Sequence, residues 1–194
     1  MRDDVRSRIL DASLKLLSEG GLGALSMRAV ARDAGVSHQA PYHYFQDREA
    51  IFAELVKTGF EGLRDYEVAA ISSSDDPKQR ALELGCAYVR FAMDNPALFQ
   101  LMFRREMVEL DNYPDAHAVA DEAFNIPQAV IAAAHGKSEA DSLPEMLACW
   151  SISHGLATLI LEGKLAHRVG ESREELDAAV RAAMTAFMGR MSPK

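Results

Sequence analysis

The stretch MRAVARDAGVSHQAPYHYF, residues 27–45, decides how the rest of the chain is interpreted. A short helical pattern of apolar residues ends at Gly35, and a second helical segment follows directly. Glycine readily takes the left-handed backbone conformation that a tight turn between two helices requires. The small apolar side chains around the turn let two helices approach closely. The stretch therefore predicts a helix-turn-helix, with one helix after Ser26 and another from Ser37 to about Tyr44.

The second helix of this pair has an unusual composition. Positions 38–44 hold two histidines, one glutamine, one proline and two tyrosines. A recognition helix lies in the major groove of DNA, where glutamine pairs with adenine and a small apolar side chain contacts the thymine methyl group. Ser26 and Ser37 are expected to cap helices whose free N–H groups could bind phosphates. We therefore predict DNA binding here, while Tyr44 and Phe45 are expected to pack in the core.

Helical signals continue through the rest of the chain, and no segment shows the alternation of a β-strand. The first helix is expected to end at Gly20-Gly21, and Asp47 is expected to cap a helix that runs to about Ile71. Beyond the break at 72–76, further helices are expected to start at Pro77, Pro96, Pro114, after Ser142 and after Ser172, the last two with Ser-x-x-Glu capping boxes. Pro127 is expected to kink or break its helix.

These signals predict an all-α protein of about nine helices. We divide it into a three-helix helix-turn-helix DNA-binding domain (1–47), a connecting helix (48–71) and a C-terminal effector-binding and dimerisation domain (72–194). The formal net charge is −8, but residues 1–48 have a net charge of +1. The acidity therefore belongs to the C-terminal part, and the N-terminal part can still bind DNA if its cations share one face.

Composition argues against several other classes of protein. Two cysteines are too few for a disulfide framework and indicate a reducing cytoplasm. There is no apolar run of about 18 residues, so no membrane span is expected, and the N-terminus lacks the pattern of a signal peptide. We find no nucleophile elbow, P-loop, Rossmann glycine pattern or zinc-protease motif. No enzymatic activity, metal site or cofactor is therefore expected.

Residues 5–55 resemble the DNA-binding domain of TetR-family transcriptional regulators. The resemblance lies in the Gly-terminated first helix, in Ser26-Met27-Arg28, in Ala34-Gly35-Val36-Ser37, in Tyr42-x-Tyr44-Phe45 and in the Asp47-Arg48-Glu49-Ala50 helix start. A lysine that is common in the family's third helix is absent, because positions 38–40 read His-Gln-Ala. The resemblance implies base contacts from Arg28, His38, Gln39 and Ala40, and phosphate contacts from Ser26, Ser37, Tyr42, His43 and Arg48.

In this family the C-terminal helices bind a small effector. The stretch at 150–163, WSISHGLATLILEG, resembles a Trp-x-x-x-His-Gly signature of one TetR subgroup. Trp150 and His154 lie one helical turn apart and could line an effector pocket, or could form a core tryptophan beside a hydrogen-bonded histidine. Large apolar residues at 88–107 offer a second part of such a pocket, although core packing explains them equally well: Phe91, Phe99, Met102 and Phe103.

A homodimer is expected, because one recognition helix reads too few base pairs for useful specificity. Helix-turn-helix dimers bind palindromic operators with half-sites about 34–36 Å apart. The last two long helices carry apolar stripes that could form a four-helix interface or could face the chain's own core. The candidate interface residues are Leu156, Leu159, Ile160, Leu176, Val180, Ala183, Phe187 and Met191.

The sequence thus predicts a DNA-binding transcriptional regulator, a repressor released from its operator by a small-molecule effector. Two alternatives remain at this level. One is a constitutive architectural DNA-binding protein without a ligand. The other is a redox-responsive regulator that uses Cys86 and Cys149, although both lie in apolar helical stretches where thiols are usually inert.

Overall fold

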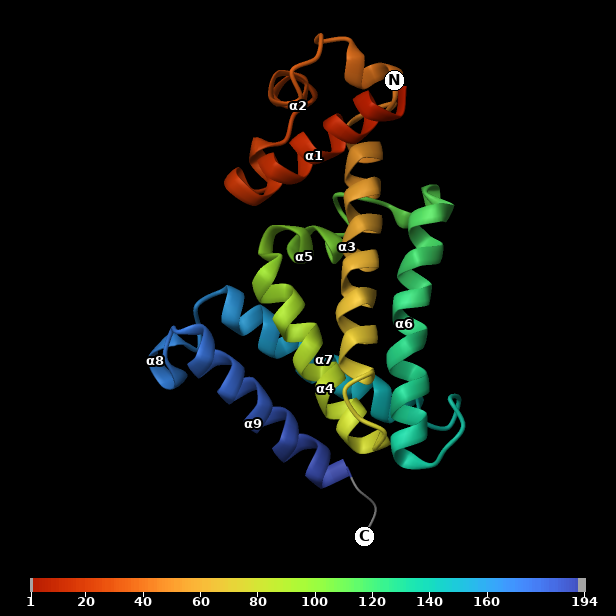
Figure 1. Ribbon diagram of the computed structural model, residues 1–194, viewed down its shortest axis with the longest axis vertical. Helices are drawn as coiled ribbons and strands as arrows, with labels where there is room; N and C mark the ends of the chain where they lie inside the picture. Colours follow the sequence, from red (N-terminus) through yellow and green to blue (C-terminus); the bar gives the residue numbers. More distant parts are fainter. Residues whose placement is uncertain (1, 192–194) are drawn as a thin grey trace. The chain divides into compact units, whose positions relative to one another are not determined.

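The computed structural model describes residues 2–191, and the side-chain environments of residues 4–190. Within this range every regular element is a helix (Figure 1), as the sequence predicts. The α-helices are α1 (Arg2–Gly20), α2 (Met27–Asp33), α3 (Arg48–Ile71), α4 (Pro77–Asp94), α5 (Pro96–Met102), α6 (Pro114–His135), α7 (Leu143–Leu161), α8 (Ala166–Val169) and α9 (Arg173–Met191). Three short 3₁₀ helices are η1 (Leu22–Ala24), η2 (Ala40–His43) and η3 (Leu110–Asn112).

The chain forms two compact units. The first consists of residues up to Glu61 together with Asn95–Ala120, and the second of Gly62–Asp94 together with residues from Asp121 onward. The boundaries fall inside α3 and α6, so each of these helices contributes residues to both units. The functional division at residues 47 and 71 is of a different kind and stays a prediction.

In the first unit α1 packs against α2 and α5 around a core of fully buried aliphatic side chains. Gly35 has a φ of 63°, as the predicted turn requires. The Val36 N–H donates to the Ala31 carbonyl at 3.0 Å, which closes the C-terminus of α2. The Arg8 guanidinium donates to the carbonyls of Ala34 and Gly35. Thus α1 holds the turn of the helix-turn-helix in place.

Most of the predicted helix starts are confirmed by their hydrogen bonds. The Ser26 hydroxyl accepts from the Ala29 N–H at 3.2 Å, and the Asp47 carboxylate accepts from the Ala50 N–H at 2.9 Å. In the capping box before α9, the Ser172 N–H donates to Glu175 Oε2 at 3.0 Å, and the Glu175 N–H donates to Ser172 Oγ at 3.2 Å. Each cap satisfies N–H groups that have no partner inside the helix.

The predicted third helix is wrong in its type and its start. The residues after Ser37 form turns and not the start of an α-helix. They lead into the four-residue 3₁₀ helix η2, whose N-cap is Gln39. The Ala40 N–H donates to the Ser37 carbonyl at 2.9 Å and the Tyr44 N–H to the Pro41 carbonyl at 3.1 Å, both with 3₁₀ spacing. Pro41 has no N–H, and its ring would clash with the carbonyl four residues earlier in an α-helix.

Pro127 lies inside α6, which continues to His135, so the helix is not broken there, and the expected kink stays a prediction. One further expectation is wrong. The capping box at Ser142 does not form, because the buried Ser142 hydroxyl donates to the Glu139 carbonyl at 3.0 Å. Glu145, its expected partner, pairs with Lys137 Nζ at 2.6 Å. The helix nevertheless starts where the sequence predicts.

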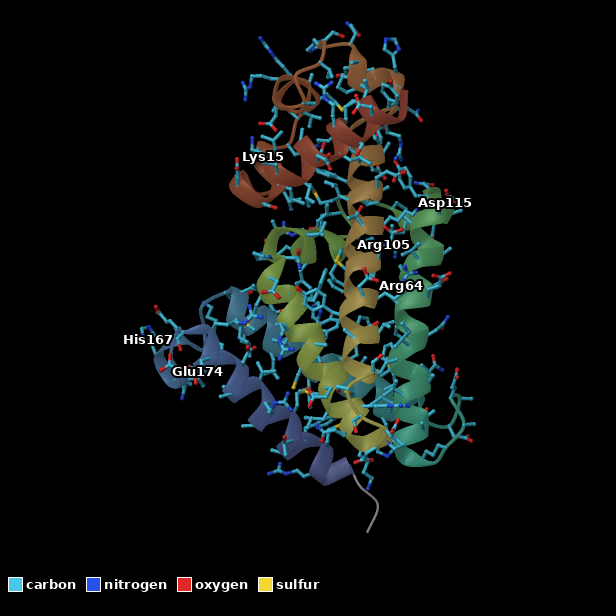
Figure 2. The ribbon with its side chains drawn as sticks, viewed as in Figure 1. Lys15, Arg64, Arg105, Asp115, His167 and Glu174 are labelled. Carbon is cyan, nitrogen blue, oxygen red and sulfur yellow. The ribbon has the colours of Figure 1, made fainter. Side chains whose placement is uncertain are left out.

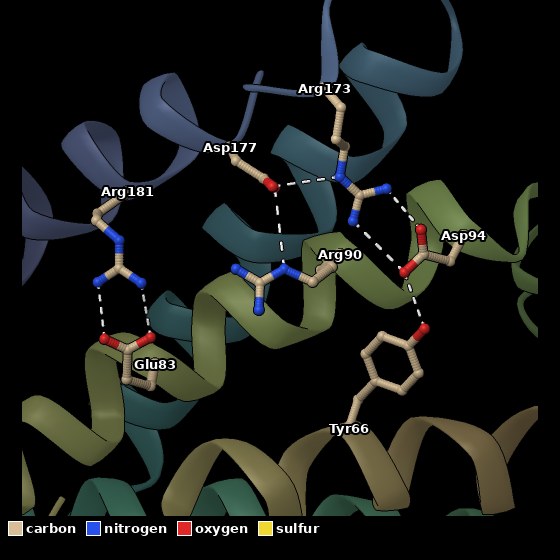
Figure 3. Close-up of polar contacts among 7 residues, drawn as sticks. All are labelled: Tyr66, Glu83, Arg90, Asp94, Arg173, Asp177 and Arg181. Carbon is tan, nitrogen blue, oxygen red and sulfur yellow. Dashed lines mark hydrogen bonds and ion pairs between the residues drawn. The ribbon is translucent and has the colours of Figure 1, made fainter. Parts of the chain in front are cut away.

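In the second unit α4 packs against both α7 and α9. Figure 3 shows that ion pairs cross between α4 and α9. Arg181 donates to both oxygens of Glu83 at 2.7 Å, and Arg173 binds Asp94, which also accepts from the Tyr66 hydroxyl at 2.8 Å. The network is completed by Arg173–Asp177 and Arg90–Asp177. These contacts fix the register of α9 along α4.

Arg181→Ala should destabilise the protein by about 1 kcal/mol at pH 7, since Glu83 loses a bidentate partner. The hydrogen bonds from Arg181 lower the pKa of Glu83. A lowered carboxyl pKa stabilises the fold above the unfolded pKa, and this contribution is lost as pH falls through the folded one. Urea unfolding of wild type and variant should therefore differ at pH 7 and converge only below the lowered pKa of Glu83. Arg190→Ala, at an exposed position of α9, is the control, and an equal loss in both variants would contradict a specific ion pair.

Candidate nucleic-acid interface and effector site

The predicted DNA-contacting residues lie in the first unit, on α2, the following turn, η2 and the first turn of α3. All are exposed except Ala40, which is half-buried: Ser26, Arg28, Ser37, His38, Gln39, Tyr42, His43 and Arg48. Pro41 and Phe45 are buried beneath them, and Tyr44 is half-buried. The structure thus anchors this segment by its apolar members and leaves its hydrogen-bonding side chains at the surface. Their contact with DNA stays a prediction.

The cations of the first unit divide into two groups. Those of α1 are engaged inside the unit: Arg6 binds Glu54 at 2.6 Å, and Lys15 (Figure 2) binds Asp33 at 2.8 Å. Among the described residues, neither Arg28 nor Arg48 has an acidic partner within ion-pair distance. The charges of these two arginines therefore remain available to phosphates.

Two ring contacts order the exposed segment. The Arg48 guanidinium lies 5.2 Å from the centre of the Phe52 ring, a cation–π contact that orients its side chain. The ring centres of His38 and Tyr42 are 6.3 Å apart, and Tyr42 remains 48% exposed. A tyrosine that is exposed to this degree has a hydroxyl and a ring face open to a partner.

Trp150 and His154 are joined in the second unit through a residue that sequence analysis did not single out. Trp150 Nε1 donates to the Tyr88 hydroxyl at 3.2 Å, and that hydroxyl lies 2.9 Å from His154 Nδ1. The Tyr88 oxygen accepts from Trp150, and the imidazole tautomer sets which of Tyr88 and His154 donates in the second hydrogen bond. Burial lowers the pKa of His154, consistent with a neutral ring. The arrangement fits either a core or a pocket lining.

Glu67 is the second residue that sequence analysis missed. Its side chain is buried at 2% exposure on α3, and its Oε2 has no hydrogen-bond partner. Burial raises its pKa to about 8. The pKa of Tyr88 is raised by burial and also by the charge of Glu67. The sequence did contain a signal that Glu67 is buried. Glu67 follows the apolar Leu63 by four positions, and residues four apart lie on the same face of a helix.

The remaining predicted pocket residues are divided between the two units. Phe91 is buried in the second unit, where its ring meets Tyr66 edge-on at 5.5 Å. Phe99 and Met102 are buried in the first unit, and Phe103 is half-buried with its ring 5.1 Å from that of Phe99. Their part in effector binding stays a prediction.

The predicted dimer residues are unequal in exposure. Val180 is buried at 3% exposure in the core of the second unit, so it has no surface to offer a partner. Leu159 is 41% exposed, and the side chain of Met191 lies outside the described range. The others are half-buried: Leu156, Ile160, Leu176, Ala183 and Phe187. Except for Val180, these residues remain candidates.

The remaining sequence expectations concern reactive groups and membranes. Cys86 and Cys149 are free and buried, and burial raises the pKa of both thiols, that of Cys149 to about 11. A buried thiol with a raised pKa reacts slowly, which counts against a redox sensor. In the described part of the chain, no group of three or more histidine, cysteine or acidic residues could hold a metal. No described helix combines the length and the apolar character that crossing a membrane needs.

The fold and the exposed N-terminal segment define an all-helical protein with a helix-turn-helix. Comparison with protein families gives the specific assignment. Residues 9–55 match the model of bacterial regulatory proteins of the tetR family, and residues 81–187 match the tetracyclin repressor-like C-terminal domain. The second match spans more than half of the chain, and the protein belongs to the TetR family.

Individual relatives agree with this assignment. The chain is 33% identical over 79 residues to the HTH-type transcriptional regulator BetI of Rhizobium meliloti, a match covering 41% of this chain and 39% of BetI. It is also 33% identical over 99 residues to the HTH-type transcriptional repressor KstR of Mycolicibacterium smegmatis, covering 51% and 48%. The chain spans less than half the length of these two relatives.

Solved structures match over nearly the whole chain. A protein of unknown function from Rhodococcus sp. RHA1 has a TM-score of 0.80 and 26% identity, covering 97% of this chain and 96% of that one. The TetR-like regulator LfrR of Mycobacterium smegmatis, solved with proflavine, has a TM-score of 0.66 and 17% identity, covering 95% and 96%. The latter similarity concerns the fold alone.

Proposed function

We propose that the protein is a homodimeric transcriptional repressor that leaves its operator when a small molecule binds its C-terminal domain. The observation that carries the proposal is the exposed segment of the first unit, which lies within the residues matched by the tetR family model. Its polar side chains and two arginines without acidic partners suit a phosphate and base-edge surface. The relative KstR is named a repressor, and LfrR was solved with a small molecule, which supports a ligand-responsive repressor here.

Within that segment we assign base contacts to Arg28, His38, Gln39 and Ala40. Phosphate contacts are assigned to Ser26, Ser37, Tyr42, His43 and Arg48. Gln39 directly precedes the 3₁₀ helix η2, so its side chain is presented from the end of a turn. This position suits a single bidentate contact to adenine.

We propose that dimerisation uses α7 and α9. Of the candidate residues on α7, Leu159 is 41% exposed, and the same helix carries the exposed apolar side chains of Leu143 and Leu147. Apolar surface of this kind marks interaction sites in soluble proteins. A twofold dimer would place two recognition segments on a palindrome with half-sites about 34–36 Å apart.

The proposed release mechanism runs through α3, because this helix contributes residues to both compact units. An effector that binds the C-terminal domain would bias α3 toward a position in which the dimer no longer fits both half-sites. Such coupling is reciprocal, so bound operator should weaken effector binding by the same factor. A protein with this function works in the cytoplasm, where the DNA is.

The test of this function is selection of bound duplexes from a random DNA library at moderate salt. An enriched palindrome with half-sites about one helical turn apart would support a sequence-specific dimer. Retention of duplexes without any enriched sequence would instead favour the architectural alternative. Failure to retain any duplex at low salt would count against DNA binding.

Arg48→Ala is expected to weaken binding to the selected operator and to random DNA by the same factor. The reason is that a phosphate contact carries no sequence information. The slope of log affinity against log salt should fall by about one. Arg168→Ala, at an exposed position of α8, changes the net charge equally and serves as the control. A loss confined to the selected operator would show that Arg48 reads a base.

A further inference from the structure

We propose that the effector of this regulator is an organic cation, such as a substituted ammonium ion, and that the Glu67 carboxylate binds its charge. The binding group is the Glu67 cluster, which we define as Glu67 of α3, Tyr88 of α4, and Trp150 and His154 of α7. The inference rests on the proposed function, because it names the chemical class of the proposed effector.

The first argument is that Glu67 lacks any partner. Its side chain is 98% buried, since only 2% is exposed, and Oε2 makes no hydrogen bond. An unpaired carboxylate in such a place costs several kcal/mol, so in the free protein Glu67 holds a proton. Even the protonated group leaves a polar atom unsatisfied. Buried unsatisfied polar groups are rare in proteins and call for a specific explanation, which a bound cation supplies.

The second argument is that Arg64, Arg90 and Arg173 pair with other acids. Arg64, one turn earlier on α3 (Figure 2), binds Glu122 at 3.1 Å. Arg90 and Arg173 belong to the network with Asp94 and Asp177 (Figure 3). No ion pair to Glu67 is formed by any described lysine or arginine. A cation that pairs with the Glu67 carboxylate would therefore be a ligand and not a side chain of the described residues.

The third argument concerns the groups around the carboxyl. The charge of Glu67 acts on the Tyr88 hydroxyl, which Trp150 and His154 hold in one orientation. The Phe124 ring meets the Trp150 ring edge-on at 5.7 Å, and Trp150 is 37% exposed. Ammonium ions bind over the faces of aromatic rings such as that of Trp150. The partial exposure of Trp150 gives the cluster an approach from solvent.

A cation that binds the carboxylate form must displace the proton that Glu67 holds. For a permanently charged ligand, affinity should therefore rise about tenfold for each pH unit and level off near pH 8, the pKa of Glu67. The other titratable groups of the cluster alter this slope little. Burial raises the pKa of Tyr88 and lowers that of His154, so both shifts favour the neutral forms of these groups.

The experiment uses tetraphenylphosphonium as the probe, because its charge does not change with pH. Trp150 is the chain's single tryptophan, so its fluorescence reports on the cluster directly. Triphenylphosphine oxide serves as a neutral comparator, tetraphenylborate as an anionic one of equal size, and benzyltrimethylammonium as a smaller cation. Titrations are made at pH 6, 7 and 8 with the full-length wild type, Glu67→Gln and Asp65→Asn. The last variant removes a charge from an exposed position of α3 and is the matched control.

The expected result is saturable binding of a cation that strengthens about tenfold from pH 6 to pH 7. Glu67→Gln should weaken binding at pH 8 at least tenfold and abolish the pH dependence, whereas Asp65→Asn should bind like wild type. Equal binding of cation and neutral comparator, preference for tetraphenylborate, or unchanged binding by Glu67→Gln would overturn the inference. So would the failure of both cations to bind at millimolar concentration.

A second readout separates this inference from the proposed function. The cation should release the wild-type protein from its selected operator and should not release Glu67→Gln. A protein that selects an operator but binds neither cation overturns the cation site and leaves the repressor function standing. Cation binding by a protein that selects no operator would support the site and count against the repressor.

Discussion

At pH 9, Glu67→Gln should be more stable than the wild type by on the order of 4 kcal/mol, since wild-type Glu67 must then ionise in a buried place. The folded-state pKa of Glu67 is raised to about 8 from 4.5. Between pH 4.5 and about pH 8, Glu67 therefore binds a proton more fully in the folded state than in the unfolded state. Wild-type stability therefore falls as pH rises through this range, by about 1.4 kcal/mol per unit, and levels off above pH 8.

Urea unfolding at pH 5, 7 and 9, followed by circular dichroism, measures this effect. The difference between Glu67→Gln and wild type should be small at pH 5 and should increase with pH. Asp65→Asn, which changes an exposed acid two residues earlier, should follow the wild type throughout. Wild-type and Glu67→Gln stabilities that differ by the same amount at all three pH values would mean that Glu67 has an ordinary pKa.

Gln39→Ala should lower affinity for the selected operator by about 1–3 kcal/mol, which is roughly 5- to 150-fold, if Gln39 makes a bidentate contact to adenine. Affinity for random DNA should change little, because a base contact adds nothing to non-specific binding. Repeating the library selection with the variant should show relaxed preference at one position of each half-site.

Gln46→Ala is the matched control, since Gln46 is also an exposed glutamine of the first unit and follows the predicted reading positions. It should leave both affinity and selected sequence unchanged. If Gln39→Ala weakened operator and random DNA alike, Gln39 would be a phosphate contact. The assignment of base reading would then have to move to Arg28 or His38.

Local sequence signals predicted most of the fold because each has a local physical cause. Asp47 and the Ser172–Glu175 box bind N–H groups within three residues, so neighbouring residues suffice to place these helix starts. The start of the third helix was wrong because the ring of Pro41 disfavours α-helical geometry at the residues before it. The short helix α8 has only four residues, too few for a periodic pattern.

The candidate site was harder to predict because its members meet only in three dimensions. The Trp-x-x-x-His spacing placed Trp150 and His154 on one face, but their bridging partner Tyr88 lies more than sixty positions earlier. In the sequence, Glu67 is one of several charged residues on a long amphipathic helix. Only the packing of the second unit shows that this charge is buried and unpaired. Val180 was a candidate for the dimer interface but is buried in the core of the second unit. An apolar stripe in a sequence has the same pattern whether it faces a partner subunit or the chain's own core.

The first compact unit is discontinuous in sequence, and this affects the order in which the protein can fold during synthesis. Residues 1–61 emerge from the ribosome before Asn95–Ala120, which complete the unit. Until then the face of α3 around Gly59 lacks Leu98 and Met102, and Phe60 lacks Phe103. Until α5 has been translated, this part of the apolar surface of α3 therefore stays uncovered. A nascent chain of this protein completes the first unit only after Ala120 has been made.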